Sequence, residues 1–105
     1  MDKRLQEIKK RIEEIKVEMS TIGTMRPGAI TEQSRGGKAK YNQLSYTHRM
    51  KGHTEYVGRR FTTEVQMQLD EYRHFKRLCD EWIGLGIEHS RLKMKIDKKS
   101  AGKDG

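Results

Sequence analysis

Apolar residues in the first part of the chain recur at the spacing of an amphipathic helix. Six of them fall at alternating steps of three and four residues: Leu5, Ile8, Ile12, Ile15, Met19 and Ile22. This is the spacing of the a and d positions of a coiled-coil heptad. Gly23 follows directly, and glycine is common just beyond a helix end because it adopts left-handed backbone angles. Residues 1–22 are therefore predicted to form an N-terminal coiled-coil helix.

A longer apolar stripe occupies the last third of the chain. Its members are again three or four residues apart: Phe61, Val65, Leu69, Tyr72, Phe75, Cys79, Trp82, Leu85, His89, Leu92 and Ile96. Residues 63–66, Thr-Glu-Val-Gln, fit a capping box at the start of a helix. Gly84 and Gly86 interrupt the run at about 1 kcal/mol each relative to alanine, which leaves room for a kink or a close approach. The stripe predicts a long helix over residues 61–97, followed by a flexible tail at 98–105.

Between the two helical patterns the chain reads as a β-hairpin. Alternate side chains of residues 41–48 point to opposite faces of a strand, and residues 53–57 form the return strand. Residues 49–52, Arg-Met-Lys-Gly, form the turn, with Gly52 supplying a positive φ. A hairpin alone is marginally stable in water, so it must pack on the helices. The side chains expected to face the helices are Leu44, Tyr46 and Val57.

The segment that precedes the hairpin contains the only proline, Pro27, and two adjacent glycines. Residues 29–32 fit a short extended piece, and residues 34–40 fit a flexible basic loop. This loop lacks the upstream glycine and the downstream Ser or Thr of a nucleotide-binding P-loop, so that assignment is discounted. Residues 23–60 are therefore interpreted as one central region, a basic loop and a β-hairpin.

The expected fold is α+β: an N-terminal helix, a central β-hairpin and a long C-terminal helix, with the helices packed antiparallel in a coiled-coil-like manner. Strong core formers (Leu, Ile, Val and Phe) number only 19 of 105 residues, few for a globular core in one copy of a chain with net charge +8. The second helix also offers more apolar positions than the first can cover. We therefore expect a homo-oligomer, a dimer or larger, formed through the C-terminal helix.

The excess positive charge is concentrated in the central region. Residues 1–22 and 61–105 each carry a net charge of +1, whereas residues 23–60 carry eight cations against only Glu32 and Glu55. Clustered cations with interleaved tyrosines are typical of nucleic-acid binding, because cations neutralise phosphates and tyrosines can contact bases. The residues predicted to contact nucleic acid are Arg26, Arg35, Lys38, Lys40, Tyr41, Tyr46, Arg49, Lys51, Arg59 and Arg60.

Three other interpretations of this region stay open. The tyrosines could pack the hairpin on the helix while the cations only keep it soluble. The protein could be a coiled-coil interaction adaptor in a larger nucleoprotein or recombinase complex, with an incidental basic hairpin. The nucleic acid could be RNA, although DNA is favoured because a two-stranded ribbon can enter a major groove.

The sequence offers little for catalysis, metals or membranes. Cys79 is the only cysteine, so no intramolecular disulfide and no cysteine-based zinc site can form. His48 and His53 flank the predicted turn and could face each other, but two imidazoles make only half a metal site. No nucleophile–base arrangement or convergent carboxylate pair has supporting spacing, so no enzyme activity and no cofactor are expected. Lacking a long apolar run, the chain is expected to be cytoplasmic and off the membrane.

Several short motifs resemble a family of small bacterial and archaeal proteins of unknown function. The motifs cover about residues 24–95 and are Met25-Arg26-Pro27-Gly28-Ala29-Ile30, Tyr41-Asn42-Gln43-Leu44-Ser45-Tyr46, Lys51-Gly52, Tyr56-Val57 and Tyr72-Arg73-His74-Phe75-Lys76-Arg77-Leu78. The resemblance implies a mobile-element context, as a regulator or accessory factor. That family typically carries cysteines in the loop before the hairpin, spaced like a metal knuckle. Residues 34–40 of this chain contain none, so a zinc site of that kind is not expected here.

Overall fold

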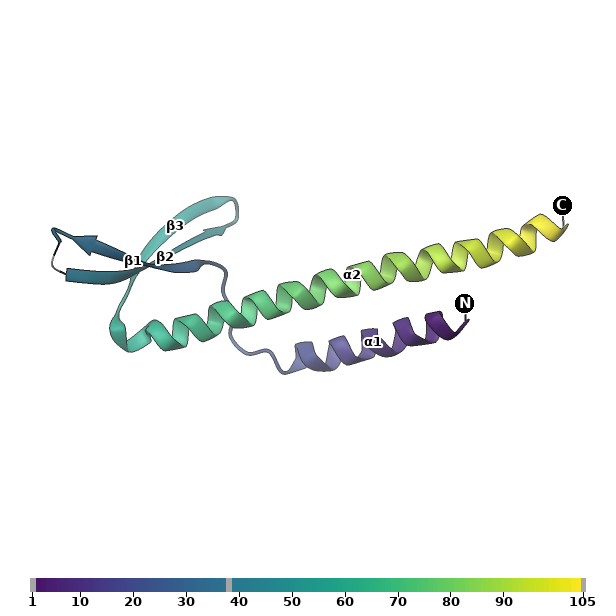
Figure 1. Cartoon of the computed structure of the whole chain (residues 1–105), viewed down its shortest axis with the longest axis horizontal. Coiled ribbons are helices and arrows are strands. Elements are labelled where there is room, and N and C mark those ends of the chain that lie inside the picture. Colours follow the sequence, from purple (N-terminus) through teal and green to yellow (C-terminus); the bar gives the residue numbers. More distant parts are fainter. Residues whose placement is uncertain (1, 38, 105) are drawn as a thin grey trace. The chain divides into compact units, whose positions relative to one another are not determined.

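The chain folds into two long helices and a central sheet. The computed structural model describes residues 2–37 and 39–104, with the side chains of Arg35 and of residues 99–104 outside the description. The elements, drawn in Figure 1, are α1 (Asp2–Ser20), β1 (Ala29–Arg35), β2 (Ala39–His48), β3 (Lys51–Val57), a 3-10 turn (Arg59–Phe61) and α2 (Thr62–Asp104). The α+β class is therefore confirmed.

The chain divides into two units, which we describe separately. The helical unit comprises Met1–Thr21 and Lys76–Gly105, and the sheet unit comprises Ile22–Phe75. Helix α2 contributes its first part to the sheet unit and the rest to the helical unit.

In the helical unit, α1 and the later part of α2 run antiparallel. Arg4 donates a hydrogen bond to Glu88, and Arg11 donates one to Glu81. A step of seven residues forward along α1 thus corresponds to a step of seven residues backward along α2. The five apolar positions of the first stripe that lie in α1 are buried or half-buried, with Ile8 and Ile15 fully buried. The heptad pattern thus identified the packed face of α1, and the antiparallel direction is as predicted. Coiled-coil packing in the strict sense stays a prediction.

In the sheet unit, the three strands form an antiparallel meander in the order β1-β2-β3. Ile30 lies opposite Leu44 on β2, which in turn lies opposite Glu55 on β3. The predicted hairpin corresponds to β2 and β3. What the sequence analysis treated as a short extended piece and a flexible loop is a complete strand, β1, with its turn into β2.

The core of the sheet unit lies between one sheet face and the first turns of α2. Leu44, Val57 and Leu69 are buried, and Ile30, Tyr46 and Val65 pack against them. Leu44, Tyr46 and Val57 are the three side chains that the alternation pattern predicted to point inward. Burying an aliphatic side chain contributes about 1.5–3 kcal/mol, so this small cluster is what holds the sheet to the helix.

The turn between β2 and β3 differs from the predicted one. His48 pairs with Lys51, so the turn consists of only two residues, Arg49 and Met50. Both have positive φ, 52° and 66°, as a two-residue hairpin loop of type I′ requires. Gly52 lies within β3 and has no positive φ, because the tight loop ends before it.

The segment that leads from α1 into the sheet is tied to α2. The backbone N–H of Gly23 donates to the Glu71 carboxylate (2.9 Å), and that of Arg26 donates to the carbonyl of Gln68 (3.2 Å). Gly28 follows with φ +131°, and a Cβ built there would lie 2.8 Å from the carbonyl oxygen of Ser45. Only glycine fits this crossing over β2 without displacing backbone.

Helix α2 begins and ends differently from the prediction. A 3-10 turn precedes it, and Thr62 donates its hydroxyl to the carbonyl of Gly58, so the predicted capping box at residues 63–66 does not mark the start. Phe61, the first stripe position, lies in that turn and is largely exposed. The helix continues to Asp104, through the residues that we expected to be a tail.

The two glycines in α2 do not interrupt the helix, and no described neighbour lies against them. The helix is continuous through Gly84 and Gly86, and no atom lies within 4 Å of a Cβ built at either. Among the described residues, the close approach that these glycines would have allowed does not occur. One core residue of this helix, Leu78, is buried although the predicted stripe did not include it.

Candidate nucleic-acid interface

The cations of the sheet unit fall at the two ends of the sheet. Arg49 and Lys51 lie at the turn between β2 and β3. At the other end, Lys40 lies early in β2, while Arg59 and Arg60 lie in the 3-10 turn after β3. From residue 40 to residue 48 the strand rises about 26 Å, at about 3.3 Å per residue. The predicted contact residues thus form two groups rather than one continuous patch.

Four of these cations are exposed and form no ion pair with a described carboxylate. Arg49 and Lys51 are exposed, as are Arg59 and Arg60. None of these four cations makes an ion pair with a carboxylate in residues 2–37 or 39–98, the part whose placement is described with side chains. They are therefore available to an external anion.

The two carboxylates of the central region each engage one cation. Lys40 lies 3.3 Å from Glu32, in a pair that is largely exposed. Arg26 lies 3.6 Å from Glu55. An exposed pair of this kind contributes at most about 1 kcal/mol and is readily exchanged for a phosphate, so Lys40 stays a candidate contact.

Arg26 and Tyr46 belong to an internal cluster instead. The Tyr46 hydroxyl donates to Glu55 (2.6 Å), and the Arg26 guanidinium lies 4.8 Å from the Tyr46 ring centroid. The hydrogen bond from Tyr46 lowers the pKa of Glu55, with a further contribution from the Arg26 charge. The same bond raises the pKa of Tyr46. Both predicted contact residues therefore face the helix side of the sheet, and we remove them from the candidate interface.

The histidines do not face each other across the hairpin. His53 lies opposite Tyr46, and the two rings stack with centroids 4.8 Å apart, whereas His48 lies opposite Lys51. The proposed facing pair was wrong because the turn is two residues shorter than predicted. Among the described residues, no three His, Cys, Asp or Glu side chains lie close enough to share a metal ion.

Two tyrosines lie on the sheet face turned away from α2. The rings of Tyr41 and Tyr56 are tilted against each other, with centroids 6.2 Å apart. A pocket beside them is lined by Glu32, Lys40, Tyr41, Asn42, Tyr56, Val57 and Arg59. The predicted contact residue Tyr41 thus lies with two cations. Tyr56 was missed as a site residue, although the alternation along β3 could have placed it on this face.

The outward sheet face was also missed. We define the outer sheet face as the described side chains that alternation and register place opposite the core: Ala29, Thr31, Gln33, Ala39, Tyr41, Gln43, Ser45, Thr47, Gly52, Thr54 and Tyr56. None of these described side chains is charged, and the register adds position 35, an arginine, opposite Ala39. Of the remaining predicted contacts, the side chain of Arg35 and all of Lys38 lie outside the described part of the chain.

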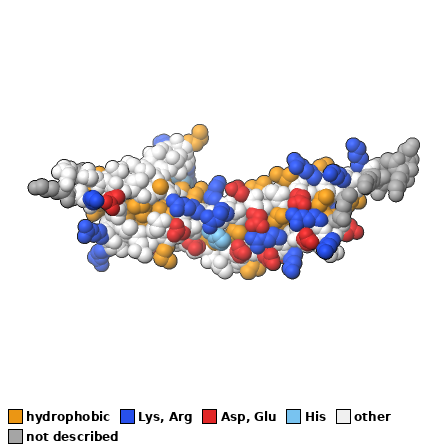
Figure 2. Space-filling model, in the orientation of Figure 1, with side chains coloured by type: hydrophobic (Ala, Val, Ile, Leu, Met, Phe, Trp, Pro, Cys, Tyr) orange, Lys and Arg blue, Asp and Glu red, His pale blue; other side chains and the backbone are white. Residues whose placement is uncertain are grey.

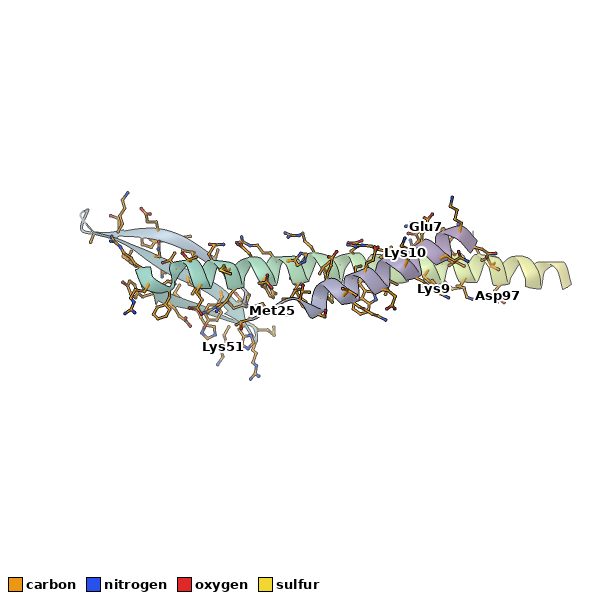
Figure 3. The ribbon with its side chains drawn as sticks, turned by 90° about the horizontal axis from the view of Figure 1, so that it is seen from below. Glu7, Lys9, Lys10, Met25, Lys51 and Asp97 are labelled. Carbon is orange, nitrogen blue, oxygen red and sulfur yellow. The ribbon has the colours of Figure 1, made fainter. Side chains whose placement is uncertain are left out.

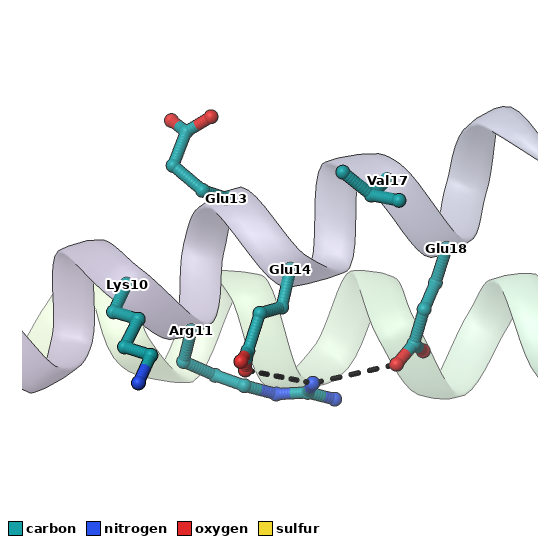
Figure 4. A pocket seen from close by; sticks show the side chains of 6 residues that line it. All are labelled: Lys10, Arg11, Glu13, Glu14, Val17 and Glu18. Carbon is teal, nitrogen blue, oxygen red and sulfur yellow. Dashed lines mark hydrogen bonds and ion pairs between the residues drawn. The ribbon is translucent and has the colours of Figure 1, made fainter.

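The helical unit also carries a net charge of +4, from 14 cations and 10 carboxylates, but several of its charges are paired with each other. Figure 2 shows Lys, Arg, Asp and Glu side chains interspersed along the helices. Arg11 accounts for three of the pairs, with Glu81 at 2.5 Å, Glu18 at 3.4 Å and Glu14 at 3.5 Å, the last two drawn in Figure 4. The hydrogen bond to Glu81 raises the pKa of Arg11 and lowers that of Glu81.

The pocket shown in Figure 4 lies along α1 and is open to solvent on one side. Its lining carries both signs of charge and one apolar side chain: Lys10, Arg11, Glu13, Glu14, Val17 and Glu18. A surface of this kind selects neither anions nor cations, so we do not treat it as a site. Neither described helix has an apolar stretch of the length that a bilayer crossing needs.

The chain was compared with protein-family models, with curated protein sequences and with solved structures. None of the three comparisons finds a match. The family resemblance of the sequence motifs therefore stays a prediction, and the function has to be argued from the charges and side chains of the sheet unit.

Proposed function

We propose that the protein binds nucleic acid, DNA in preference to RNA, through the cations at the two ends of its sheet. The carrying observation is a charge imbalance. Residues 23–60 contain eight cations and two carboxylates, and each carboxylate engages a single cation. Arg49, Lys51, Arg59 and Arg60 are left exposed, and binding to a polyanion releases the counterions that such cations otherwise hold.

The arrangement favours an extended anion over a small one. The two groups of cations are separated by most of the length of β2, about 26 Å at about 3.3 Å per residue. A small phosphate compound could contact only one group at a time. A nucleic-acid backbone offers phosphates along its whole length and can contact both. A regulatory or accessory role in a mobile-element context is a further proposal, and it comes from the motif resemblance alone.

The test is a salt titration of binding to a random-sequence duplex. The affected variants are Arg49→Ala/Lys51→Ala and Arg59→Ala/Arg60→Ala. The matched control is Lys9→Ala/Lys10→Ala, which removes the same charge from α1 (Figure 3). A plot of log affinity against log salt concentration has a negative slope, and each lost phosphate contact makes it shallower by about 0.9. Each double variant of the sheet unit should therefore make the slope shallower by about 2.

The control should leave the slope unchanged. Equal losses in the control and in the sheet-unit variants would mean that net charge, rather than these positions, drives binding. Absence of binding at low salt would refute the proposal. Competition with single-stranded RNA separates the RNA alternative, which would be favoured if RNA displaced the duplex at equal concentration.

A second candidate function, the interaction adaptor, is supported by exposed apolar side chains on α2. Ile83, Ile87 and Met94 are 61%, 47% and 62% exposed, and their spacing of four and seven residues places them on one side of the helix. An exposed apolar row of this kind favours association with a protein partner or a second copy. Sedimentation of the wild type and of Ile83→Glu/Ile87→Glu would test it, because the variant should lose any association.

A further inference from the structure

The described side chains of the outer sheet face are uncharged, and the register places one further position, Arg35 opposite Ala39, on the same face. Strand alternation puts Ile30, Leu44 and Val57 on the face that packs on α2, so their sequence neighbours face the other way. Thr31, Ser45, Thr54 and Tyr56 are exposed there. No described element of the sheet unit covers this face. The sequence region that contains it, residues 23–60, carries a net charge of +6.

The side chains at the centre of this face suit hydrogen bonding to base edges. Gln43 lies on the central strand, opposite Thr31 on one side and Tyr56 on the other. Gln33 donates to the Thr31 hydroxyl (3.1 Å). A glutamine amide presents a donor and an acceptor together, which matches the paired acceptor and donor of adenine in the major groove. Hydroxyl groups can serve as either partner.

The described cations lie at the two ends of the sheet. Arg49 lies in the turn at one end and Arg59 beyond the other, whereas the register assigns Lys40 and Lys51 to the core-side face, opposite Ser34 and His48. In protein–DNA interfaces, contacts to phosphates fix the position of the protein on the duplex, and hydrogen bonds to base edges give sequence specificity. A protein-binding surface would instead have a core enriched in apolar side chains.

The width of the sheet also matches the width of the major groove of DNA. All three strands are paired only along residues 42–45 of β2, and beyond that each end continues as a two-stranded ribbon. Two strand spacings of about 4.8 Å separate the outer strands by about 10 Å. The major groove of B-form DNA is about 12 Å wide, whereas that of A-form RNA is too narrow for side chains to read.

We propose that the outer sheet face lies in the major groove of duplex DNA and reads base edges, with Gln43 as the central reader, flanked by Gln33 and Thr31. The inference rests on the proposed function, and it adds where and how sequence is recognised. The cations at the two ends contact the phosphates that border the groove. Binding is therefore sequence-selective and not only electrostatic.

The test begins with selection of preferred duplexes from a randomised pool by the wild-type protein. Binding of Gln43→Ala to a selected duplex and to a random duplex is then measured at one salt concentration. Loss of one bidentate base contact corresponds to about a 10-fold weakening, and it should appear for the selected duplex only. Gln6→Ala, the same change at an exposed position of α1, is the control and should change neither.

Other variants keep the test independent of folding. Thr31→Ala, on the edge strand β1, should weaken binding to the selected duplex without affecting the random one. Lys51→Ala should weaken binding to both equally and lower the salt slope. Far-ultraviolet circular dichroism checks that each variant keeps its helices and sheet.

Three results would overturn the inference, and only one of them would also overturn the proposed function. If selection yields no preferred sequence although binding is salt-dependent, base reading fails and the proposed function survives. The same conclusion follows if Gln43→Ala and Thr31→Ala weaken selected and random duplexes equally. If the protein does not bind duplex DNA at low salt, the inference and the proposed function fail together.

Discussion

Replacing Gly28 by alanine should destabilise the sheet unit more than any other glycine substitution in it that avoids the turns. Gly28 has φ +131°, and an added Cβ would lie 2.8 Å from the carbonyl oxygen of Ser45 and 3.0 Å from atoms of Leu44 and Tyr46. A backbone conformation of this kind costs an L-amino acid on the order of 1–3 kcal/mol. Overpacking against a fixed strand adds about 1–3 kcal/mol.

The expected loss is therefore about 2–6 kcal/mol, a large share of the roughly 5–15 kcal/mol by which small proteins are stable. The matched control is Gly52→Ala. Gly52 lies in β3 with no positive φ and no atom within 4 Å of a built Cβ. Alanine there should leave stability unchanged or raise it by up to about 1 kcal/mol, because it restricts the unfolded chain.

The assay can follow the two units by different chromophores. All four tyrosines lie in Ile22–Phe75, the sheet unit, whereas Trp82, the only tryptophan, lies in the helical unit. Urea unfolding is followed by tyrosine near-ultraviolet circular dichroism and by selectively excited tryptophan fluorescence. For Gly28→Ala the tyrosine transition should move to lower urea. An unchanged tyrosine transition, or a loss equal to that of Gly52→Ala, would refute the steric reasoning.

Two further predictions concern ionised pairs. Hydrogen bonds from Arg11 lower the pKa of Glu81, so their stabilisation is fully present above the ordinary carboxyl pKa of about 4.3 and is lost as the pH falls through the lowered value. Acid unfolding followed by Trp82 fluorescence should be less steep in Arg11→Gln, and identical profiles would contradict this origin. Tyr46→Phe removes the 2.6 Å hydrogen bond to Glu55 and should move the urea midpoint slightly lower, because water screens a half-exposed carboxylate. Urea unfolding of this variant at neutral pH measures the loss, and no change would show that water replaces the hydroxyl.

Periodicity predicted the helices well because each has one face that must be buried. The stripe of α1 identified its packed side, and the alternation of β2 identified Leu44 and Tyr46 as inward-facing. The spacing of apolar residues within one segment shows which of its side chains are buried, and no information about other segments is needed. Element ends were less well predicted, because α2 starts from a 3-10 turn and continues to Asp104.

Strand β1 was missed because its sequence has almost no strand signal. Ala29–Arg35 contains one strong apolar residue, Ile30, among polar ones. Its backbone hydrogen bonds to β2 stabilise it as a strand. Which segment a strand pairs with cannot be predicted from that strand's sequence alone. With β1 unassigned, the sequence could not show that Thr31, Gln33 and Gln43 share a face.

The candidate site was predicted by charge but not by geometry. Counting cations identified residues 23–60 as the basic region, and four of the predicted residues are exposed and form no ion pair with a described carboxylate. Counting could not show that Arg26 and Tyr46 are engaged with Glu55. Such engagement depends on the path of residues 22–28 across the sheet, which local patterns do not specify.

The two-residue turn at Arg49 and Met50 has a consequence for how this chain tolerates changes in length. Inserting or deleting one residue there would shift the pairing of β3 by one position and turn every one of its side chains over. Val57, now 6% exposed, would be carried out to solvent, and the outer sheet face would acquire Glu55 and Lys51. Homologous chains should therefore vary freely in the identity of these two residues while keeping their number fixed.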